Sequence, residues 1–587
     1  MNTEHMIKNR NNATPEIRRL LESCPDGTTL VLPPGDIHFH PDGALEKYYY
    51  VSNNRHSLKR IVFPIIEKKK ITIDGGGARF IFHGEVVPFA VEQSEEIVLR
   101  NFSVDWERPF YSEGVITGAD DAGVTVKVDR SVFPFHSEGR KMIFDGEGWS
   151  HGFHEGLFEL DAATGMSAYL SGDAMGAGVR SSWEAEEEDA EHIRIRERFF
   201  RRPKIGNILV LRHYPRLCPA IFLKQSKDTL IENITLYHAG GMGVIGQFCE
   251  NITVRFCQVT PPAGRHFSVT VDATHFVNCR GLVTLEDCLF EGQLDDSTNV
   301  HGINTRVQKI LDDVSLITER VHHEQYGVEI GFPGDRMKFS CNATMLAYAE
   351  NRIVSVEPVD ERTAKIIFEN RLPEALQPGH VLENMDWSAD LRITGCTVRS
   401  ARARGFLIST PGRVVVENNR IEAPGSAIKI SGDANYWFES GAVRDVLIRR
   451  NTFGDCCYGP IEWGRAVIDI DPEIADPHGN PDCFHRGIRI ENNRFSTFDT
   501  GILYARSVDG ITFIGNTIHR TKNYPALRRM NALLTFEACR SMDVHGNQMD
   551  AGIPDPLVAG EDECKVIEPN GQSSAIDRVN EAAVLER

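Results

Sequence analysis

The sequence has little that would suit a membrane or a nucleic acid. It contains no run of about 18 apolar residues, which is what a membrane-spanning helix needs. Its 64 Lys and Arg are outnumbered by 83 Asp and Glu, giving a formal net charge of −19. Polyphosphates and anionic membrane surfaces are bound by clustered basic side chains. We therefore expect no nucleic-acid and no membrane partner, and a neutral ligand fits better.

Two further patterns are missing from this sequence, that of a secretory signal and that of a C-x-x-C cysteine pair. Its beginning, MNTEHMIKNRNNATPEIRRLLE, has no basic start followed by an apolar core. A cytoplasmic protein is therefore expected, although a shortened chain would look the same. The 13 cysteines include no C-x-x-C pair, which argues against a disulfide framework or a zinc site and favours buried free thiols.

What recurs instead is a short β-rich segment with an asparagine near a turn. Examples are LIENITLYH, CENITVRFC, VVVENNRIE, VLIRRNTFG, IRIENNRFS, ITFIGNTIH and MDVHGNQMD. Each alternates apolar and polar residues, as a strand with one face inward does. Such self-similarity indicates a solenoid whose stacked parallel strands bury that face continuously. The asparagines are expected to form a structural ladder at equivalent turns.

Helical periodicity is weak except in TPEIRRLLES, residues 14–23, where Thr14 is the expected N-cap. This helix is expected to close the open end of the solenoid. Two stretches, 107–210 and 304–388, break the coil rhythm. They contain alternating strands such as GVTVKVDRSVF, which predict small antiparallel barrels or sandwiches inserted into the solenoid.

The predicted fold class is therefore all-β, a right-handed parallel β-helix with two inserted small antiparallel β-barrel or sandwich domains. The predicted division is a cap with first coils at 1–106, an inserted domain at 107–210, central coils at 211–303, a second inserted domain at 304–388, and C-terminal coils with a tail at 389–587.

The segment with the clearest chemistry is HFSVTVDATHFVNCRGLVTLEDCLFEGQLDDSTNVHGIN. Asp272 precedes Asp295 by 23 residues (295 − 272), about one coil of such a solenoid, and Asp296 follows directly. Neighbouring strands lie about 4.8 Å apart, so the three carboxyls would crowd one patch and repulsion would push their pKa values apart. Glycoside hydrolysis needs one protonated and one ionised carboxyl.

Two other interpretations of this cluster stay open. An Asp-Asp pair often begins a turn, and three carboxylates with backbone carbonyls can bind calcium. Adjacent residues of a regular strand also point to opposite faces, so Asp295 and Asp296 can share one groove only if the backbone bulges or turns between Leu294 and Ser297.

Substrate contacts are predicted downstream, in NVHG, SARARGFLIS and KISGDANYWFESGAV, where loops of successive coils could converge on one groove. The predicted residues are Asn299, His301, Arg404, Asn435, Trp437 and Glu439. Four of them have a plainer alternative: His301 as a hydrogen-bonded histidine at a strand end, Trp437 as packing, and Arg404 with Glu439 as an ion pair.

The chain resembles glycoside hydrolase family 110, the α-1,3-galactosidases. The resemblance is carried by KYYYVSNNRHSLKRIVFPIIEKKKITIDGGGARFIFHG, NFSVDWERPFYSEG, the block from SVTVDATHFVNCRG to LDDSTNVHG, and SGDANYWFESG. It implies a parallel β-helix with β-barrel insertions, catalysis without a metal or organic cofactor, and exo-hydrolysis of terminal α-galactose with inversion. By the same match, the catalytic acids fall on Asp272, Asp295 and Asp296.

By analogy with other inverting β-helix hydrolases, Asp295 is expected to protonate the glycosidic oxygen, while Asp272 and Asp296 hold the attacking water; Asp272 as the acid is the alternative. The expected substrate is a galactose-terminated oligosaccharide. Two other functions remain alternatives: a carbohydrate-binding β-helix without turnover, and a polyuronide hydrolase or lyase, which the lack of a basic cluster near LDDSTNVHG disfavours. The oligomeric state, including a homo-oligomer, is open.

Overall fold

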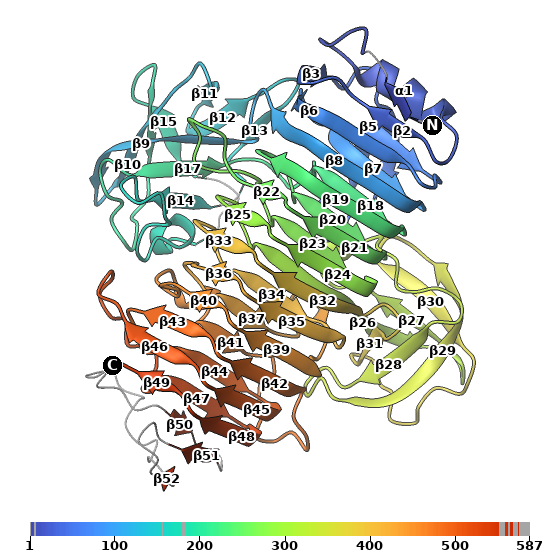
Figure 1. The fold of residues 1–587 in the computed structure, drawn as a ribbon, viewed down its shortest axis with the longest axis vertical. Coiled ribbons are helices and arrows are strands. Elements are labelled where there is room, and N and C mark those ends of the chain that lie inside the picture. The colour runs from blue at the N-terminus through green and yellow to red at the C-terminus, as the bar shows by residue number, and fades with distance from the viewer. Residues whose placement is uncertain are drawn as a thin grey trace.

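The computed structural model describes residues 7–154, 156–178 and 183–550, and the backbone of short strands at 2–4, 558–560, 564–567 and 573–574. Most of this chain winds into one elongated stack of strands, with the N-terminal coils at one end and the C-terminal coils at the other (Figure 1). Within these ranges, no helix is long and apolar enough to cross a membrane.

The stack is a parallel β-helix because each strand pairs in parallel with the equivalent strand one coil later. One face runs through β6 (Thr72–Phe82), β8 (Glu95–Trp106), β19 (Lys227–Leu236), β21 (Glu250–Arg255), β24 (Arg280–Glu286), β32 (Ala389–Thr394) and β35 (Arg413–Glu417). It continues through β39 (Asp445–Arg449), β42 (His485–Glu491), β45 (Val508–Ile514) and β48 (Arg540–His545).

A second parallel face positions the candidate site. It runs through β7 (Val87–Glu92), β18 (Ile221–Lys224), β20 (Val244–Gln247), β23 (Thr274–Val277), β26 (Thr298–Ile310), β34 (Phe406–Ser409), β37 (Ile428–Ile430) and β41 (Ile468–Ile470). Residues at matching positions therefore stack in columns, each about 4.8 Å from the next.

Alternation along these strands builds the core. In the first coils Phe63, Phe80, Phe89 and Phe102 are buried and their rings stack, with centroids 4.4 Å apart for Phe63 and Phe89 and 4.7 Å for Phe80 and Phe102. Burying each such side chain contributes about 1.5–3 kcal/mol. A continuous apolar column of this kind explains why coils without long helices remain folded.

The predicted asparagine ladder is present in the later coils. Asn419, Asn451, Asn493, Asn516 and Asn547 are buried, and the side-chain oxygen of each of the last four accepts the backbone and side-chain N–H groups of its predecessor at 2.9–3.2 Å. In the NN and GN steps, the residue just before each ladder asparagine adopts a left-handed backbone. In each step the first residue therefore makes the turn, and the asparagine that follows it contributes its side chain to the ladder.

The predicted helix is α1 (Thr14–Ser23), at the N-terminal end of the stack (Figure 1). It buries Ile17 and Leu21. The prediction that Thr14 caps it is wrong: Ala13 holds the N-cap position and no side chain caps the helix. The Thr14 hydroxyl is engaged elsewhere, because it donates to the His40 carbonyl at 2.9 Å and accepts the His40 N–H at 3.0 Å.

Two antiparallel units project from the stack (Figure 1). The first contains a six-stranded sheet built on β9 (Tyr111–Asp120), β10 (Gly123–Val128), β14 (Leu157–Leu160), β15 (Ala185–Glu187), β16 (His192–Ile195) and β17 (Ile208–Arg212). A three-stranded sheet of β11 (Phe135–Glu138), β12 (Lys141–Asp145) and β13 (Ser150–Gly152) accompanies it.

The second unit is a closed barrel. Its strands follow the order β26, β27 (Ser315–Glu319), β30 (Thr363–Phe368), β29 (Ala347–Pro358), β28 (Arg336–Ser340), β31 (Val381–Asn384) and back to β26. β26 therefore belongs to both the solenoid and the barrel. The predicted fold class, a parallel β-helix with two inserted antiparallel units, is confirmed. So are the buried free thiols, since 11 cysteines of the described ranges other than Cys539 form no disulfide and 9 of these 11 are buried.

Candidate active site

The three predicted aspartates lie together at the start of two neighbouring strands of the second face. Asp272 stands just before β23, and Asp295 with Asp296 just before β26. The backbone from 294 to 297 is a bend outside any strand, so the departure from regular strand geometry that the sequence required is present. One oxygen of each of the three carboxyls lies within 4.8 Å of the others.

The register of the coils sets this geometry. Thr274 pairs with Thr298 and Thr298 with Phe406, and two residues before each stands Asp272, Asp296 and Arg404 respectively. Asp272 is therefore in register with Asp296 rather than Asp295. The Asp296 backbone N–H donates to Asp272 Oδ1 at 3.0 Å, which joins the two coils at the site.

Asp295 is held by two arginines. Arg402 Nη1 donates to its Oδ1 at 3.0 Å and Arg216 Nη2 to its Oδ2 at 3.3 Å. Although burial opposes ionisation, the charges of Arg402 and then Arg216 hold the pKa of Asp295 below its ordinary value. Its side chain is 15% exposed, more than that of Asp272 or Asp296.

Each of these arginines is anchored by one of the inserted units. Arg402 donates from Nε and Nη2 to the two carboxylate oxygens of Asp173 at 2.8 and 2.7 Å, in the first unit. Arg216 lies 3.7 Å from the carboxylate of Glu324, in the second unit. The inserted units therefore help to orient Asp295.

Asp296 is paired with the next coil. The Arg404 backbone N–H and Nε both donate to Asp296 Oδ1 at 3.0 Å, and Nη2 lies 3.0 Å from Oδ2. Burial, with smaller contributions from the charges of Asp295 and Asp272, raises the pKa of Asp296 to about 7 against the opposing charge of Arg404. Asp296 therefore changes its charge near neutral pH.

Asp272 is linked to two buried histidines. Its Oδ2 lies 2.6 Å from His275 Nδ1, and His275 Nε2 lies 2.9 Å from His301 Nε2. His301 Nδ1 is 2.7 Å from the Gly302 carbonyl, which can only accept, so Nδ1 carries a hydrogen. A neutral His301 then accepts at Nε2 and His275 donates to it.

This chain of hydrogen bonds also shows which group holds the proton between Asp272 and His275. Burial lowers the pKa of His275 to about 4 and lowers that of His301, so both rings are neutral. Burial, followed by the charge of Asp295, raises the pKa of Asp272 well above its ordinary value. The proton between Asp272 and His275 therefore belongs to the carboxyl. The cluster thus holds an ionised Asp295, a protonated Asp272 and an Asp296 near its midpoint.

The carboxyls open into a cavity of about 890 Å³. Among the residues that line it are Asn299, Arg404, Trp437 and Glu439, as predicted from the sequence. Asn299 Nδ2 donates to both oxygens of Glu439 at 3.4–3.5 Å. Arg404 pairs with Asp296 rather than with Glu439, so the plain ion pair considered for those two residues is absent from the structure.

The cavity has an aromatic edge. Trp437 is 37% exposed and its ring centroid lies 4.3 Å from that of His322, which the barrel unit supplies. Asp433 shapes the loop by accepting the backbone N–H groups of Tyr436 and Trp437. A partly exposed indole held in this way presents a flat apolar surface to the cavity.

Two predicted substrate contacts do not reach the cavity. The side chain of His301 has no exposed surface, because it is enclosed behind His275, so the plainer interpretation of a hydrogen-bonded histidine describes it. Asn435 turns away and exchanges hydrogen bonds with Asn342 of the barrel at 3.1 and 3.2 Å. Neither side chain lines the cavity.

Several functional candidates were not predicted. Arg216, Arg402 and His275 bind the aspartates directly, and Arg212 lines the same cavity. The inference that no basic cluster lies near LDDSTNVHG was wrong for the folded chain. The arginines come from coils before and after that segment and gather beside it only when the chain folds. The ARAR and RHYPR motifs were the available signals.

Comparisons with known proteins agree with this architecture. A family model described as GLAA-B beta-barrel domain I matches residues 112–209, and one described as GLAA-B beta-barrel domain II matches residues 315–382. Alpha-1,3-galactosidase B of Bacteroides thetaiotaomicron is 36% identical over 556 residues, covering 93% of this chain and 89% of that protein. Alpha-1,3-galactosidase A of Shewanella woodyi is 35% identical over 542 residues, covering 91% and 88%.

Among solved structures, an exopolygalacturonase from Thermotoga maritima covers 94% of this chain and 92% of its own, with 11% identity and a TM-score of 0.39.

Proposed function

Because this chain belongs to the α-1,3-galactosidase family, glycoside hydrolase family 110, we propose that it removes terminal α-1,3-linked galactose from oligosaccharides or glycans. The reaction is exo-hydrolysis, in which the galactose occupies the cavity and the remainder of the glycan extends toward its mouth. The aromatic edge at Trp437 offers a surface for a sugar's apolar face.

The observation that carries this proposal is the carboxyl cluster at the cavity wall. Asp272, Asp295 and Asp296 lie within reach of one another, and their environments push their pKa values in different directions. Acid–base hydrolysis of a glycosidic bond needs carboxyls in different protonation states within one site. A purely binding site has no such requirement.

In the proposed mechanism, ionised Asp296 takes a proton from water while Asp272, joined to it by the Asp296 N–H, helps to orient that water. Water attacks the anomeric carbon, the bond to the departing oxygen breaks, and Asp295 protonates that oxygen. One displacement inverts the anomeric centre. The carboxyls are closer together than the roughly 6.5–9.5 Å usual for inversion, so the water must sit at the edge of the cluster.

The acid role of Asp295 has a definite physical condition. In the free enzyme its two arginines favour the ionised form, so its pKa must rise when substrate excludes water and weakens an arginine contact. Asp295 is nevertheless the most exposed of the three carboxyls, whereas the Asp272 proton points to His275. A substrate with an activated aryl leaving group separates the two roles, because it needs little protonation.

We expect Asp295→Asn to lose far less turnover on an aryl α-galactoside than on an α-1,3-galactoside, and Asp296→Asn to lose turnover equally on both. If Asp272→Asn shows the leaving-group effect and Asp295→Asn does not, the acid is Asp272. Near-normal turnover of all three variants on both substrates would remove the catalytic assignment altogether. Circular dichroism of each variant checks that the fold is retained.

The polyuronide alternative gains support from the five arginines and one lysine that line the cavity, but three of these arginines are engaged with the aspartates of the cluster. Arg404 pairs with Asp296, and Arg402 and Arg216 with Asp295. A substrate carboxylate would have to displace those partners. An assay panel can test whether the chain prefers galactosides to polyuronides. The panel contains branched fucosylated and linear α-1,3-galactosides, α-1,4- and α-1,6-galactosides, and polygalacturonate. Inactivity on every member favours a binding protein.

A further inference from the structure

A second cluster of ionisable side chains lies in the first coils, away from the aspartates. Phe39 of β3 (Gly35–Phe39), Phe82 of β6 and Trp106 of β8 stand at matching positions of neighbouring coils. The residues that follow them are His40, His83 and Glu107. Parallel register therefore stacks two histidines and a glutamate in one column on the outside of the helix, and period-two alternation places His38 on the same face as His40.

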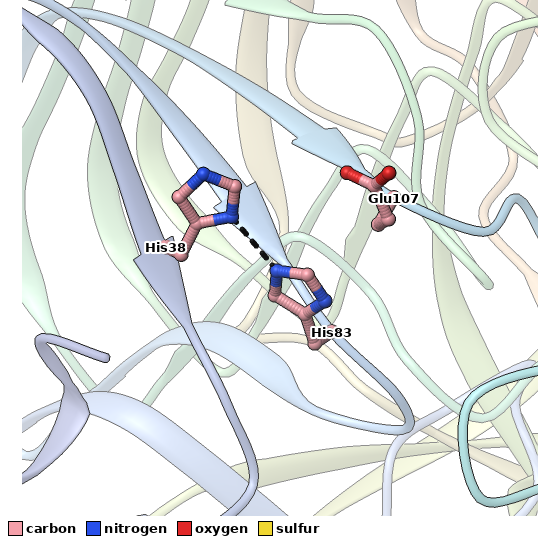
Figure 2. A group of neighbouring side chains, drawn as sticks. All are labelled: His38, His83 and Glu107. Atoms are coloured by element: carbon pink, nitrogen blue, oxygen red, sulfur yellow. Dashed lines mark hydrogen bonds between the residues drawn. The ribbon is translucent and has the colours of Figure 1, made fainter. Parts of the chain in front are cut away.

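The donor atoms of three of these residues face one another. His38 Nδ1 lies 2.9 Å from His83 Nε2, and one oxygen of Glu107 lies within 4.8 Å of a ring nitrogen of each histidine. Figure 2 shows the two rings pointing toward each other, with the glutamate beside them just past the end of a strand. Tetrahedral metal sites with bonds of about 2.0–2.2 Å need donor atoms a little over 3 Å apart, so small side-chain rotations suffice.

The His83 ring is also held from behind. Its Nδ1 lies 2.7 Å from Glu147 Oε1, and the other Glu147 oxygen accepts the Gly84 N–H at 3.2 Å. The His40 ring stacks on His83 at 4.0 Å with an interplanar angle of 7°. A carboxylate that accepts a hydrogen bond from one ring nitrogen fixes the tautomer and leaves the other nitrogen without a hydrogen, so that its lone pair can bind a metal. Such a carboxylate is the usual outer support of a metal-binding histidine.

We propose that His38, His83 and Glu107 form a binding site for a divalent transition-metal ion of the zinc type, with Glu147 as the outer support of His83. Two imidazoles and one carboxylate suit zinc, cobalt or nickel rather than calcium or magnesium, which prefer all-oxygen sites. Glu107 is exposed, so an ion can enter from solvent and water can complete the coordination.

The position suggests what such an ion would do. Its ligands come from the coils of β3, β6 and β8, and Glu147 lies between β12 and β13 of the first inserted unit. A bound ion would therefore connect the N-terminal coils with one another and, through Glu147, with that unit. Its role is structural, and it is independent of the galactosidase reaction proposed for the aspartates.

Isothermal titration of the metal-free full chain with Zn²⁺ tests the proposal, with Co²⁺ absorption as the report on coordination. We expect one saturable ion per chain, a Co²⁺ spectrum typical of a low-coordinate nitrogen and oxygen site, and a higher melting temperature with Zn²⁺. His38→Gln and Glu107→Gln, both at outward-facing positions, should each weaken binding at least tenfold, because each removes one of three ligands.

Two control variants make the result specific. His192→Ala removes a histidine that pairs with Asp189 in the first unit and should leave binding unchanged. Asp295→Asn should also leave it unchanged, whereas loss of Zn²⁺ binding there would assign the ion to the aspartate cluster and overturn the proposal. Absence of saturable binding, or equal binding by wild type, His38→Gln and Glu107→Gln, would overturn it as well.

Discussion

Replacing Arg404 with glutamine should move the pH dependence of catalysis. Arg404 makes two hydrogen bonds of 3.0 Å to Asp296 Oδ1, and its charge lowers the pKa of a carboxyl that burial raises to about 7. If ionised Asp296 activates the water, kcat/KM of the wild type rises with pH through a limb near 7. Removing the guanidinium removes the largest contribution that favours ionised Asp296.

The size of the effect follows from the contact. An opposite charge within about 4–6 Å lowers a carboxyl pKa by roughly 1–3 units. Without Arg404 the limb should therefore lie about 1–3 pH units higher. The ionised fraction of Asp296 at pH 7 then falls from about one half to between roughly one tenth and one thousandth, so kcat/KM falls about 5-fold to 500-fold. Part of this loss should be recovered as pH rises.

The assay is the kcat/KM–pH profile of wild type, Arg404→Gln and Arg404→Lys on one α-1,3-galactoside, with melting temperatures as the fold control. The lysine keeps the charge but loses the planar fork, so its limb should shift less than that of the glutamine variant. If Arg404→Gln lowers kcat/KM by the same factor at every pH and the limb stays in place, Arg404 acts on the substrate and not on Asp296.

Further predictions concern positioning, binding and stability. Asp173→Asn should lower kcat about tenfold in steady-state assays, because asparagine keeps only one of the two oxygens that orient Arg402 toward Asp295 and carries no charge; an unchanged kcat, with exposed Asp121→Asn as the control, would show that the first unit does not support the site. His275→Phe should lower kcat at least tenfold and change KM little, since it removes the hydrogen-bond partner of the Asp272 carboxyl; equal changes in both constants would contradict this. Trp437→Ala should raise KM about 2-fold to 10-fold with little change in kcat, and Tyr348→Ala on the barrel is its control. Asn493→Ala should lower the free energy of unfolding by about 1–3 kcal/mol in urea titrations, because buried ladder partners lose their hydrogen bonds; a loss no larger than that of Asn480→Ala would refute the ladder's importance.

The sequence predicted the features that depend on local periodicity. Alternating strands and the NN and GN steps identified the solenoid, and the asparagine ladder from Asn419 to Asn547 is where stacked turns require it. The one-coil spacing between Asp272 and the Asp295–Asp296 pair brought the three carboxyls together. These inferences succeeded because a solenoid converts sequence spacing directly into distance.

The remainder of the site depends on contacts that spacing does not encode. Arg216 and Arg402 reach Asp295 across 79 and 107 residues, and Asp173 reaches Arg402 across 229. The second inserted unit lies between Asp295 and Arg402 in the sequence, and Asp173 belongs to the first unit, so the coil repeat does not relate these residues. Thr14 failed as a cap for a similar reason, because its hydroxyl satisfies the backbone of His40 on a neighbouring segment.

The burial of His301 could not be inferred either. Its strand position was clear, but whether it faced the cavity or stood behind another ring depended on His275, which occupies the position between it and Asp272. A histidine three residues after a candidate aspartate was the available signal. In the same way, Asn435 lies in a loop whose direction is set by its contact with Asn342 of the barrel.

The most direct test of the central claim is proton NMR of the full chain acting on linear α-1,3-galactobiose during early turnover. Free galactose should appear first as the β-anomer, and Asp296→Asn should form it far more slowly under the same conditions. Initial α-galactose would mean retention and a nucleophilic carboxylate, and equal rates for wild type and Asp296→Asn would contradict the assignment of the reaction to this aspartate cluster.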